Sequence, residues 1–202
     1  MKLSILIPSL NEKDTIEKVI NTAKSTGLRF FDKFEIIVAD NGSTDGSLEV
    51  LKKRNDIKLL RVPVRGYGAA LHFGILSAKY SYVLFADADL SYDFSEIEKF
   101  IPYIQKEYDL ILGSRFKGEM EEGAMPFTHR FLGTPILTSL IRRIYKINTS
   151  DCNSGMRTVN KSFYQQLCMK NSGMEWASEL LIKTALKKGK YIEVPIHFYK
   201  DQ

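Results

Sequence analysis

The sequence predicts an α/β fold built on a mostly parallel, Rossmann-like β-sheet with helices on both faces. Three observations predict it. In the first half of the chain, continuous apolar runs of strand length alternate with amphipathic segments of helix length. Polar clusters directly follow four of these apolar runs, where a parallel sheet places its ligand. No internal repeat or low-complexity linker divides the chain, so we expect one domain over residues 1–202.

The expected elements follow one another in βαβ order. The five expected strands span residues 3–8, 34–40, 57–62, 82–87 and 108–114. The helices expected between them span residues 14–25, 45–54, 69–78 and 94–104. Beyond a loop at residues 119–126, the pattern predicts a helix over residues 130–147, a helix that contains Glu175 and Glu179, and a last strand over residues 190–198. The alternation of apolar strands and amphipathic helices changes after the fifth strand, which predicts a distinct C-terminal half of the same domain.

The composition is that of an ordinary globular protein, and the formal net charge of +5 suits an anionic partner. Cys152 and Cys168 have no metal-binding spacing and are too few for a disulfide scaffold, which indicates a reducing compartment. No run approaches the roughly 20 apolar residues that span a bilayer. The apolar run at the N-terminus is too short for the core of a signal peptide. We therefore expect a cytoplasmic protein.

Asp87 and Asp89 form a pair of carboxylates at the end of an apolar strand, in “VLFADADLSYD”. A buried strand rarely ends in concentrated negative charge unless a cation lies there. Two hard oxygen ligands that leave most coordination positions open suit Mg²⁺ or Mn²⁺ that also carries a diphosphate. The alternative is a solvated loop with two acids. The four polar clusters expected at one sheet edge favour the metal site.

Two further clusters allow a purely structural interpretation. The stretch “DNGSTDGS”, which begins at Asp40, has the composition of a turn followed by a helix N-cap. The stretch “RGYGAALHFGI” fits a strand-to-helix turn with a positive φ at Gly66 or Gly68. It is not a dinucleotide-binding fingerprint, because that glycine-rich loop would follow the first strand, where this chain has “PSLNE”.

Four motifs, in this order and spacing, resemble glycosyltransferase family 2: “SILIPSLNE”, “IIVADNGSTDGS”, “FADADLS” and “GSR”. In the C-terminal half, “DCNSGMR” and “MEWASELLIKTALKKGKYIEVPI” are similar to the polyprenyl-phosphate branch, which includes the dolichol-phosphate mannose and glucose synthases. The resemblance implies an inverting A-type glycosyltransferase fold that moves a hexose from a UDP- or GDP-sugar to a dolichyl or undecaprenyl phosphate. It also implies Mg²⁺ or Mn²⁺ as cofactor, a peripheral contact with the cytoplasmic face of a membrane, and no nucleic-acid partner.

The resemblance assigns roles to individual residues. The nucleotide-sugar-binding residues would be Pro8, Ser9, Glu12, Asp40, Gly68, Asp87, Ala88 and Asp89, with Asp40 accepting a hydrogen bond from the base. The metal ligands would be Asp87, Asp89 and Ser91. The catalytic residues would be Asp89, Arg115, Asp151 and Arg157, with both arginines on the acceptor side. On this basis residues 1–115 form the nucleotide-sugar-binding half, and residues 116–202 form the acceptor-binding half.

The chain departs from the family pattern in three ways. Leu10 stands where the dolichol-phosphate mannose synthases often carry tyrosine. Ser91 stands where some members carry a glutamine as third metal ligand. Relatives continue beyond the position of Gln202 into a Ser-Lys-containing loop, amphipathic helices and often membrane spans. The chain is therefore expected to be a short enzyme or a fragment that lacks part of the acceptor site.

Two classes of acceptor remain open from the residues. A hydroxyl acceptor needs a general base, for which Asp151 is the candidate. A lipid phosphate, with a second pKa of about 6, is already anionic and needs arginines in place of a base. Arg115 and Arg157, together with Arg142 and Arg143, favour the phosphate. The helix over residues 130–147 either packs on the sheet or lies on anionic lipid, since it carries apolar residues at helical spacing beside basic ones.

Three other functions are weighed against this one. A family 2 transferase that acts on a sugar hydroxyl in glycan assembly and a non-catalytic nucleotide-sugar-binding subunit both remain alternatives. A processive polysaccharide synthase would carry a Gln-x-x-Arg-Trp motif, whereas the only tryptophan, Trp176, lies in “MEWASE”.

Overall fold

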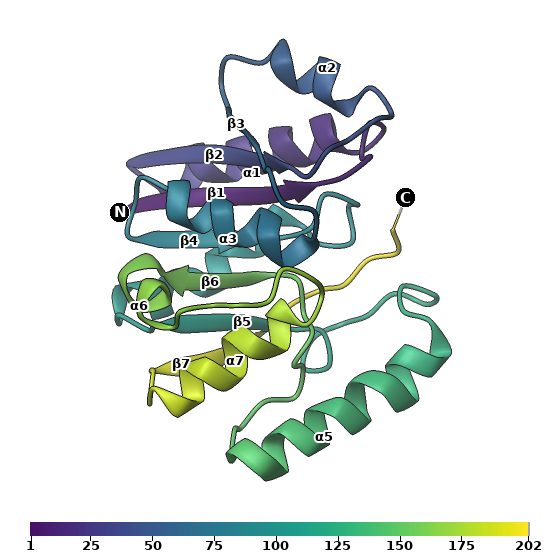
Figure 1. Ribbon diagram of the computed structural model, residues 1–202, viewed down its shortest axis with the longest axis vertical. Coiled ribbons are helices and arrows are strands. Elements are labelled where there is room, and N and C mark those ends of the chain that lie inside the picture. Colours follow the sequence, from purple (N-terminus) through teal and green to yellow (C-terminus); the bar gives the residue numbers. More distant parts are fainter. Residues whose placement is uncertain (202) are drawn as a thin grey trace.

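The computed structural model describes residues 1–201 and contains one seven-stranded sheet with the strand order β3-β2-β1-β4-β6-β5-β7 (Figure 1). Its strands are β1 Lys2–Ser9, β2 Lys33–Asp40, β3 Lys58–Arg61, β4 Tyr82–Phe85, β5 Leu110–Ser114, β6 Arg157–Asn160 and β7 Tyr191–Pro195. All neighbouring strands are parallel except β6, which runs antiparallel to both β4 and β5. The predicted α/β fold with a mostly parallel sheet is confirmed.

Helices cover both faces of the sheet. The helical segments are α1 Ile16–Phe30, α2 Ser47–Lys52, α3 Tyr67–Ser77, the 3₁₀ helix η1 Phe94–Phe100, α4 Ile101–Gln105, the π-helical turn η2 His129–Gly133, α5 Thr134–Tyr145, α6 Lys161–Gln166 and α7 Trp176–Leu186. Residues of α1 and η1 share one buried cluster, and residues of α3, α6 and α7 share the other. The two clusters lie on opposite faces because successive side chains of a strand point to opposite sides.

Strand β1 shows how the sequence sets up these two layers. Leu3, Ile5 and Ile7 belong to the cluster under α1, whereas Leu6 belongs to the cluster under α3. All four side chains are fully buried, as expected for a central parallel strand covered on both faces. The continuous apolar run therefore predicts a strand buried on both sides, and the structure confirms it.

The sequence did not predict β6. This strand is four residues long, begins with the buried Arg157, and has no apolar run that would mark it as a strand. It inserts between β4 and β5 and joins the two halves of the chain into one sheet. The stretch “DCNSGMR” therefore ends inside the sheet rather than wholly in a loop.

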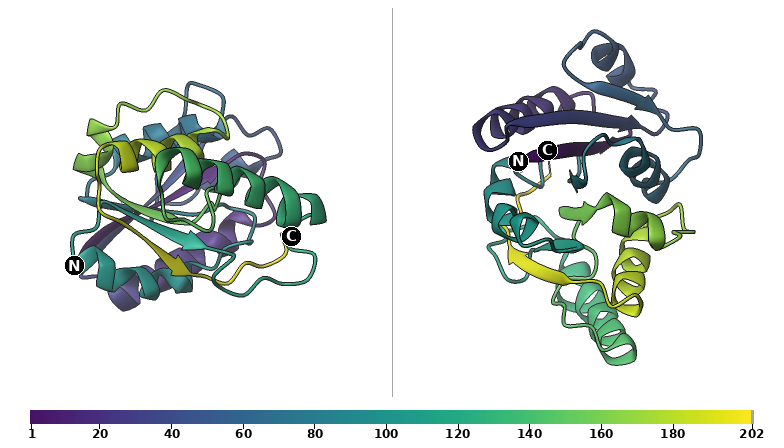
Figure 2. Two further views of the ribbon diagram at one scale, coloured as in Figure 1. Left: turned by 90° about the horizontal axis from the view of Figure 1, so that it is seen from below. Right: turned by 90° about the vertical axis from the view of Figure 1, so that its left-hand side faces the viewer.

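Helix α5 lies at one end of the molecule, outside the sheet and its covering helices (Figures 1 and 2). It occupies most of the helix predicted over residues 130–147, and the preceding η2 turn makes it continuous from His129. Its buried residues are confined to Thr134, Thr138 and Ile141. The helix thus touches the body along a narrow strip.

Candidate active site

A pocket lies at the carboxyl ends of β1, β2 and β4, where the sequence places its polar clusters. It is lined by Pro8, Ser9, Leu10, Glu12, Asn41, Tyr67, Ala70, Asp87, Ala88, Asp89 and Met174. The register of the sheet explains this convergence, because Ser9 at the end of β1 pairs with Asp40 at the end of β2. The loop after β4 then brings the paired carboxylates to the same edge.

The Asp87 carboxylate is held at the pocket by the hydroxyl of Tyr67, which donates to Oδ1 at 2.8 Å. Burial raises the pKa of Asp87 to about 6, and the neighbouring Asp89 adds to this rise. Burial also raises the pKa of Glu12, with a further contribution from Asp89. Three carboxylates therefore converge on the pocket, and their mutual repulsion would be relieved by a bound cation.

The donor set fits a divalent cation that shares its coordination with a ligand. Within residues 1–201, no group of three or more acidic, histidine or cysteine side chains is close enough to enclose a metal ion. Asp87 and Asp89 can supply two hard oxygen ligands, which leaves the remaining positions to phosphate oxygens and water. This is how Mg²⁺ is usually bound beside a substrate phosphate.

Ser91, expected as a third metal ligand, instead fixes Asp89. Both its backbone N–H, at 2.9 Å, and its hydroxyl donate to Oδ1 of Asp89, and the side chain is buried. Leu90 adopts a left-handed conformation with φ of 67°, which turns the chain sharply between Asp89 and Ser91. The geometry gives Ser91 a positioning role, and we leave it out of the proposed ligand set.

On the base side, Asn41 rather than Asp40 lines the pocket. The Asp40 carboxylate is buried and accepts hydrogen bonds from the backbone of Gly42 and Ser43, at 3.1 and 3.2 Å. This is the turn geometry that the composition of the stretch allows. Asn41 accepts from the N–H of Gly66 at 2.7 Å and so fixes the loop that precedes α3. A contact between Asp40 and a base stays a prediction.

The other predicted nucleotide-binding residues divide into two groups. Pro8, Ser9 and Ala88 line the pocket and are buried, and the Ser9 hydroxyl has no hydrogen-bond partner within residues 1–201. Gly68 instead lies against α7, since a Cβ built on it would approach the Cβ of Trp176 to 2.5 Å. Gly68 therefore allows close helix packing, while the positive φ of 131° falls on Gly66.

Among the residues predicted to face the acceptor, Arg115 and Asp151 form a bidentate ion pair. Nε and Nη2 of Arg115 donate to the two Asp151 oxygens at 2.7 and 2.8 Å, and its backbone N–H adds a third bond at 3.2 Å. Asp151 is fully buried. The positive charge of Arg115 acts to lower the pKa of Asp87, which places this pair beside the carboxylate pocket. The arrangement makes Asp151 an orienting group for Arg115.

Glu193 of β7 organises the loop that carries Asp151. It accepts hydrogen bonds from the backbone N–H groups of Ser150 and Asp151, at 2.6 and 3.2 Å, and from the Thr149 hydroxyl. Lys117 forms an ion pair with it at 2.8 Å. This loop is thereby tied to the far edge of the sheet.

Arg157 does not face the acceptor side. Its guanidinium is fully buried and donates to the carbonyl oxygens of Cys152, Ser154 and Ala177, at 2.7–2.8 Å. These bonds use Nε, Nη1 and Nη2, so the side chain holds the loop of residues 152–154 against α7. The expectation that Arg157 contacts the acceptor is corrected on this geometry, because its side chain is fully buried and each of its three nitrogens donates to a backbone carbonyl.

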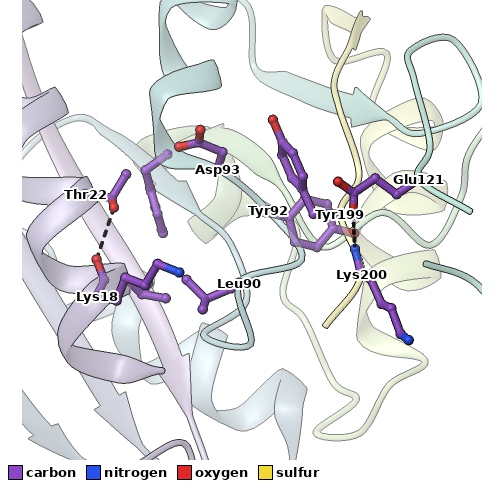
Figure 3. A pocket seen from close by; sticks show the side chains of 10 residues that line it. Lys18, Thr22, Leu90, Tyr92, Asp93, Glu121, Tyr199 and Lys200 are labelled. Carbon is purple, nitrogen blue, oxygen red and sulfur yellow. Dashed lines mark hydrogen bonds between the residues drawn. The ribbon is translucent and has the colours of Figure 1, made fainter. Parts of the chain in front are cut away.

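Tyr92 connects the loop that carries Asp87 and Asp89, which we call the metal-side loop, with the loop that carries Asp151, which we call the acceptor-side loop after its predicted role. Its hydroxyl accepts a hydrogen bond from the N–H of Gly155 at 2.7 Å, and its ring packs on Phe198 with 5.0 Å between centroids. Behind this loop lies a second pocket, to which α1 contributes Lys18 and Thr22 (Figure 3). The C-terminal segment closes it, since Tyr199 N–H donates to the Ser91 carbonyl at 3.0 Å.

Sequence reasoning missed four residues of the site: Asn41, Tyr67, Tyr92 and Glu193. Three of them stand next to residues that were singled out, namely Asp40, Gly68 and Ser91. For these three residues the sequence offered no signal other than their position, because their roles depend on hydrogen bonds to partners far along the chain. Glu193 offered a stronger signal, since a glutamate inside the apolar strand “YIEVPI” requires a buried partner.

The chain has the A-type glycosyltransferase fold. This class of protein is defined here by the sheet, the pocket at its carboxyl edge and the paired carboxylates. Residues 4–168 match the sequence profile described as glycosyl transferase family 2. The chain belongs to this family. The family prediction is thereby confirmed, and the assignment to a branch within it stays a prediction.

Known relatives span a longer sequence than this chain. The low-salt glycan biosynthesis hexosyltransferase Agl6 of Haloferax volcanii is 31% identical over 198 residues, which cover 98% of this chain and 48% of Agl6. The glycosyltransferase AglJ of the same organism is 26% identical over 196 residues, which cover 96% of this chain and 62% of AglJ. This chain therefore spans about half the length of Agl6 and less than two thirds of AglJ.

A solved structure shows the same fold. Glucosyl-3-phosphoglycerate synthase from Mycobacterium tuberculosis, in complex with Mn²⁺, UDP-glucose and phosphoglyceric acid, superimposes with a TM-score of 0.74. The sequence identity is 21%, and the match covers 97% of this chain and 70% of that chain. At this identity the likeness demonstrates the fold.

Proposed function

We propose that this chain is a metal-dependent glycosyltransferase that takes a hexose from a UDP- or GDP-sugar. The observation that carries the proposal is the convergence of Glu12, Asp87 and Asp89 on one pocket at the carboxyl edge of the sheet. The name of Agl6 supports transfer of a hexose, and the Mn²⁺ and UDP-glucose in the synthase structure support a metal-bound sugar nucleotide.

In the proposed complex, Asp87 and Asp89 hold Mg²⁺ or Mn²⁺ against the diphosphate. The bound metal would neutralise the negative charge that develops on the diphosphate leaving group. Tyr67 keeps Asp87 directed at the pocket, and Ser91 does the same for Asp89. The chain's own contribution is therefore a preorganised pair of oxygen ligands beside a cavity that receives the nucleoside.

We further propose a phosphate-bearing acceptor, of the polyprenyl phosphate class. A hydroxyl acceptor needs a base, but Asp151, the candidate for that role, is fully buried and paired with Arg115. A phosphate monoester is anionic near neutral pH and needs no base. Asp151 takes Nε and Nη2 of Arg115, which leaves Nη1 as the donor for an acceptor oxygen. Transfer to a sugar hydroxyl is the second candidate.

Asp89→Asn tests the donor site, with Asp93→Asn in the same loop as a matched control. Asparagine at position 89 can still accept from Ser91, so the fold is expected to persist while Mn²⁺-dependent binding of UDP- and GDP-sugars is lost. Asp93 caps η1 by accepting from Ser95, a role that asparagine also fills. Calorimetric titration gives the affinities. Equal affinity of the native protein in Mn²⁺ and in chelator would refute the metal site.

The acceptor is tested by offering short-chain polyprenyl phosphate and an alkyl glycoside in parallel with a radiolabelled sugar nucleotide. Label is expected to enter the lipid phosphate. Transfer to the glycoside alone, together with its loss in Asp151→Asn, would establish the hydroxyl alternative, because a true base is then required.

A further inference from the structure

The surface formed by η2 and α5 carries a stripe of large exposed apolar side chains. Ile136, Leu140 and Ile144 follow one another at four-residue spacing and are 63%, 54% and 59% exposed. Residues four apart lie on one face of an α-helix, so these three form a continuous row. Leu132, at 53% exposed and four residues before Ile136, extends the row into η2. We call this row, with its four residues, the apolar stripe.

The apolar stripe is not the face by which the helix packs on the protein. That face consists of Thr134, Thr138 and Ile141, and the remainder of the helix stands clear of the sheet. Figures 1 and 2 show α5 as the outermost element at its end of the molecule, so a flat surface can reach its length. The helix therefore has a second apolar face that nothing in residues 1–201 covers. Such exposed apolar rows are typical of interaction surfaces.

The charge next to the apolar stripe indicates what covers it. No aspartate or glutamate occurs between Glu122 and Asp151, whereas the same segment contains Arg130, Arg142, Arg143 and Lys146. The last three line a shallow depression with Ser139 at the C-terminal end of α5. On a helical projection Arg143 and Lys146 flank the stripe on the side opposite Ile141. A partner must therefore be apolar in its interior and anionic at its surface.

We propose that the η2–α5 surface docks on a lipid bilayer that contains anionic phospholipid. In this arrangement the apolar stripe enters the boundary between headgroups and acyl chains, while Arg143 and Lys146, which flank it, contact headgroup phosphates. A second copy of the chain is a poorer occupant, because its own stripe brings only positive charge to meet these residues. Within residues 1–201 no helix has the length and apolar character needed to cross a bilayer.

The docking goes beyond the proposed function, since it does not depend on any chemistry at the carboxylate pocket. It would place that function at the surface from which a lipid-linked acceptor is available. The two proposals can therefore fail separately: vesicle binding reports on the η2–α5 surface, and sugar-nucleotide titration reports on the pocket.

The test is co-sedimentation of the full chain with phosphatidylcholine vesicles that contain or lack phosphatidylglycerol, at low and high salt. Binding is expected to increase with phosphatidylglycerol and to decrease with salt, because the basic residues act through screened charge. The variant Ile136→Gln/Leu140→Gln is expected to lower partitioning by about tenfold or more, since two apolar side chains no longer leave water. Arg143→Gln/Lys146→Gln is expected to remove the dependence on phosphatidylglycerol.

Leu186→Gln is the matched control for the stripe variant, because Leu186 is 66% exposed on a different helix. It is expected to bind vesicles as the native chain does, and all variants are expected to titrate sugar nucleotide equally. Binding that is insensitive to phosphatidylglycerol, or equal in the stripe variant and the control, would overturn the proposal. So would a concentration-dependent dimer in light scattering that Ile136→Gln/Leu140→Gln abolishes, since a second copy would then be the occupant.

Discussion

The hydroxyl of Tyr92 accepts a hydrogen bond from the backbone N–H of Gly155, and this single contact joins the metal-side loop to the acceptor-side loop. The two residues are 63 positions apart in the chain. Gly155 can approach so closely because it lacks a side chain, and a Cβ there would lie 2.2 Å from Oδ2 of Asp87. The relative position of the proposed donor and acceptor halves of the site is therefore set within a few ångströms of the proposed metal ligands.

Tyr92→Phe is expected to lower the affinity for Mn²⁺ and sugar nucleotide together, because the loop of Asp87 and Asp89 loses its link to Gly155. Stability should fall by about 1–2 kcal/mol, since a buried N–H is left without its acceptor. Chemical denaturation and calorimetric titration measure the two effects. Tyr103→Phe, on α4, is the control. Unchanged metal and nucleotide affinity would show that the link is structural only.

Gly155→Ala is expected to be more damaging than Tyr92→Phe, because the added methyl group must displace either the loop or Asp87 itself. We expect Mn²⁺-dependent binding of the sugar nucleotide to fall by about tenfold or more, equivalent to about 1.4 kcal/mol. Gly133→Ala is the control, since its Cβ would meet no atom closer than 3.7 Å and its φ of −59° is helical. Equal affinity of the two variants would contradict the close approach.

Arg115→Ala is expected to destabilise the protein by about 3–5 kcal/mol, because it leaves the fully buried Asp151 carboxylate without its charged partner. Asp151→Asn should cost less, since asparagine retains an acceptor for Arg115. The double variant Arg115→Ala/Asp151→Asn completes a thermodynamic cycle in urea denaturation. Additive effects of the two single substitutions would show that the pair is not energetically coupled.

In a chelator, Asp87→Asn is expected to be more stable than the native chain at neutral pH. Burial raises the pKa of Asp87 from 3.8 to about 6, so the folded chain binds more protons than the unfolded chain between these values. The native chain therefore loses stability as the pH rises through this window, by about 1–3 kcal/mol relative to the variant. The curves of unfolding free energy against pH for the variant and the native chain should converge below pH 4. Parallel curves from pH 4 to 8 would show that the Asp87 pKa is not raised.

Much of the fold and part of the site could be predicted from the sequence. Strands such as β1 carry a continuous apolar run that identifies them in the sequence. In a parallel sheet the loops that follow these strands lie at one edge, so the sequence predicted that Glu12, Asp87 and Asp89 lie close together, as they do in the pocket. Local patterns were less informative where a polar side chain serves the fold itself. Asp40 closes its own turn, Ser91 bonds Asp89, and Arg157 binds carbonyl oxygens, and each of these choices depends on neighbours that periodicity does not reveal.

The short strand β6 also determines when the sheet can be completed during synthesis. Strand β5 has only β6 and β7 as neighbours, and β4 reaches β5 only through β6. Both later strands follow residue 156, so a nascent chain that has produced β5 must keep it unpaired while a further 40 or so residues emerge. The apolar strand “LILGS” is exposed to aggregation throughout that interval, and residues 1–115 cannot be expected to fold as an independent unit.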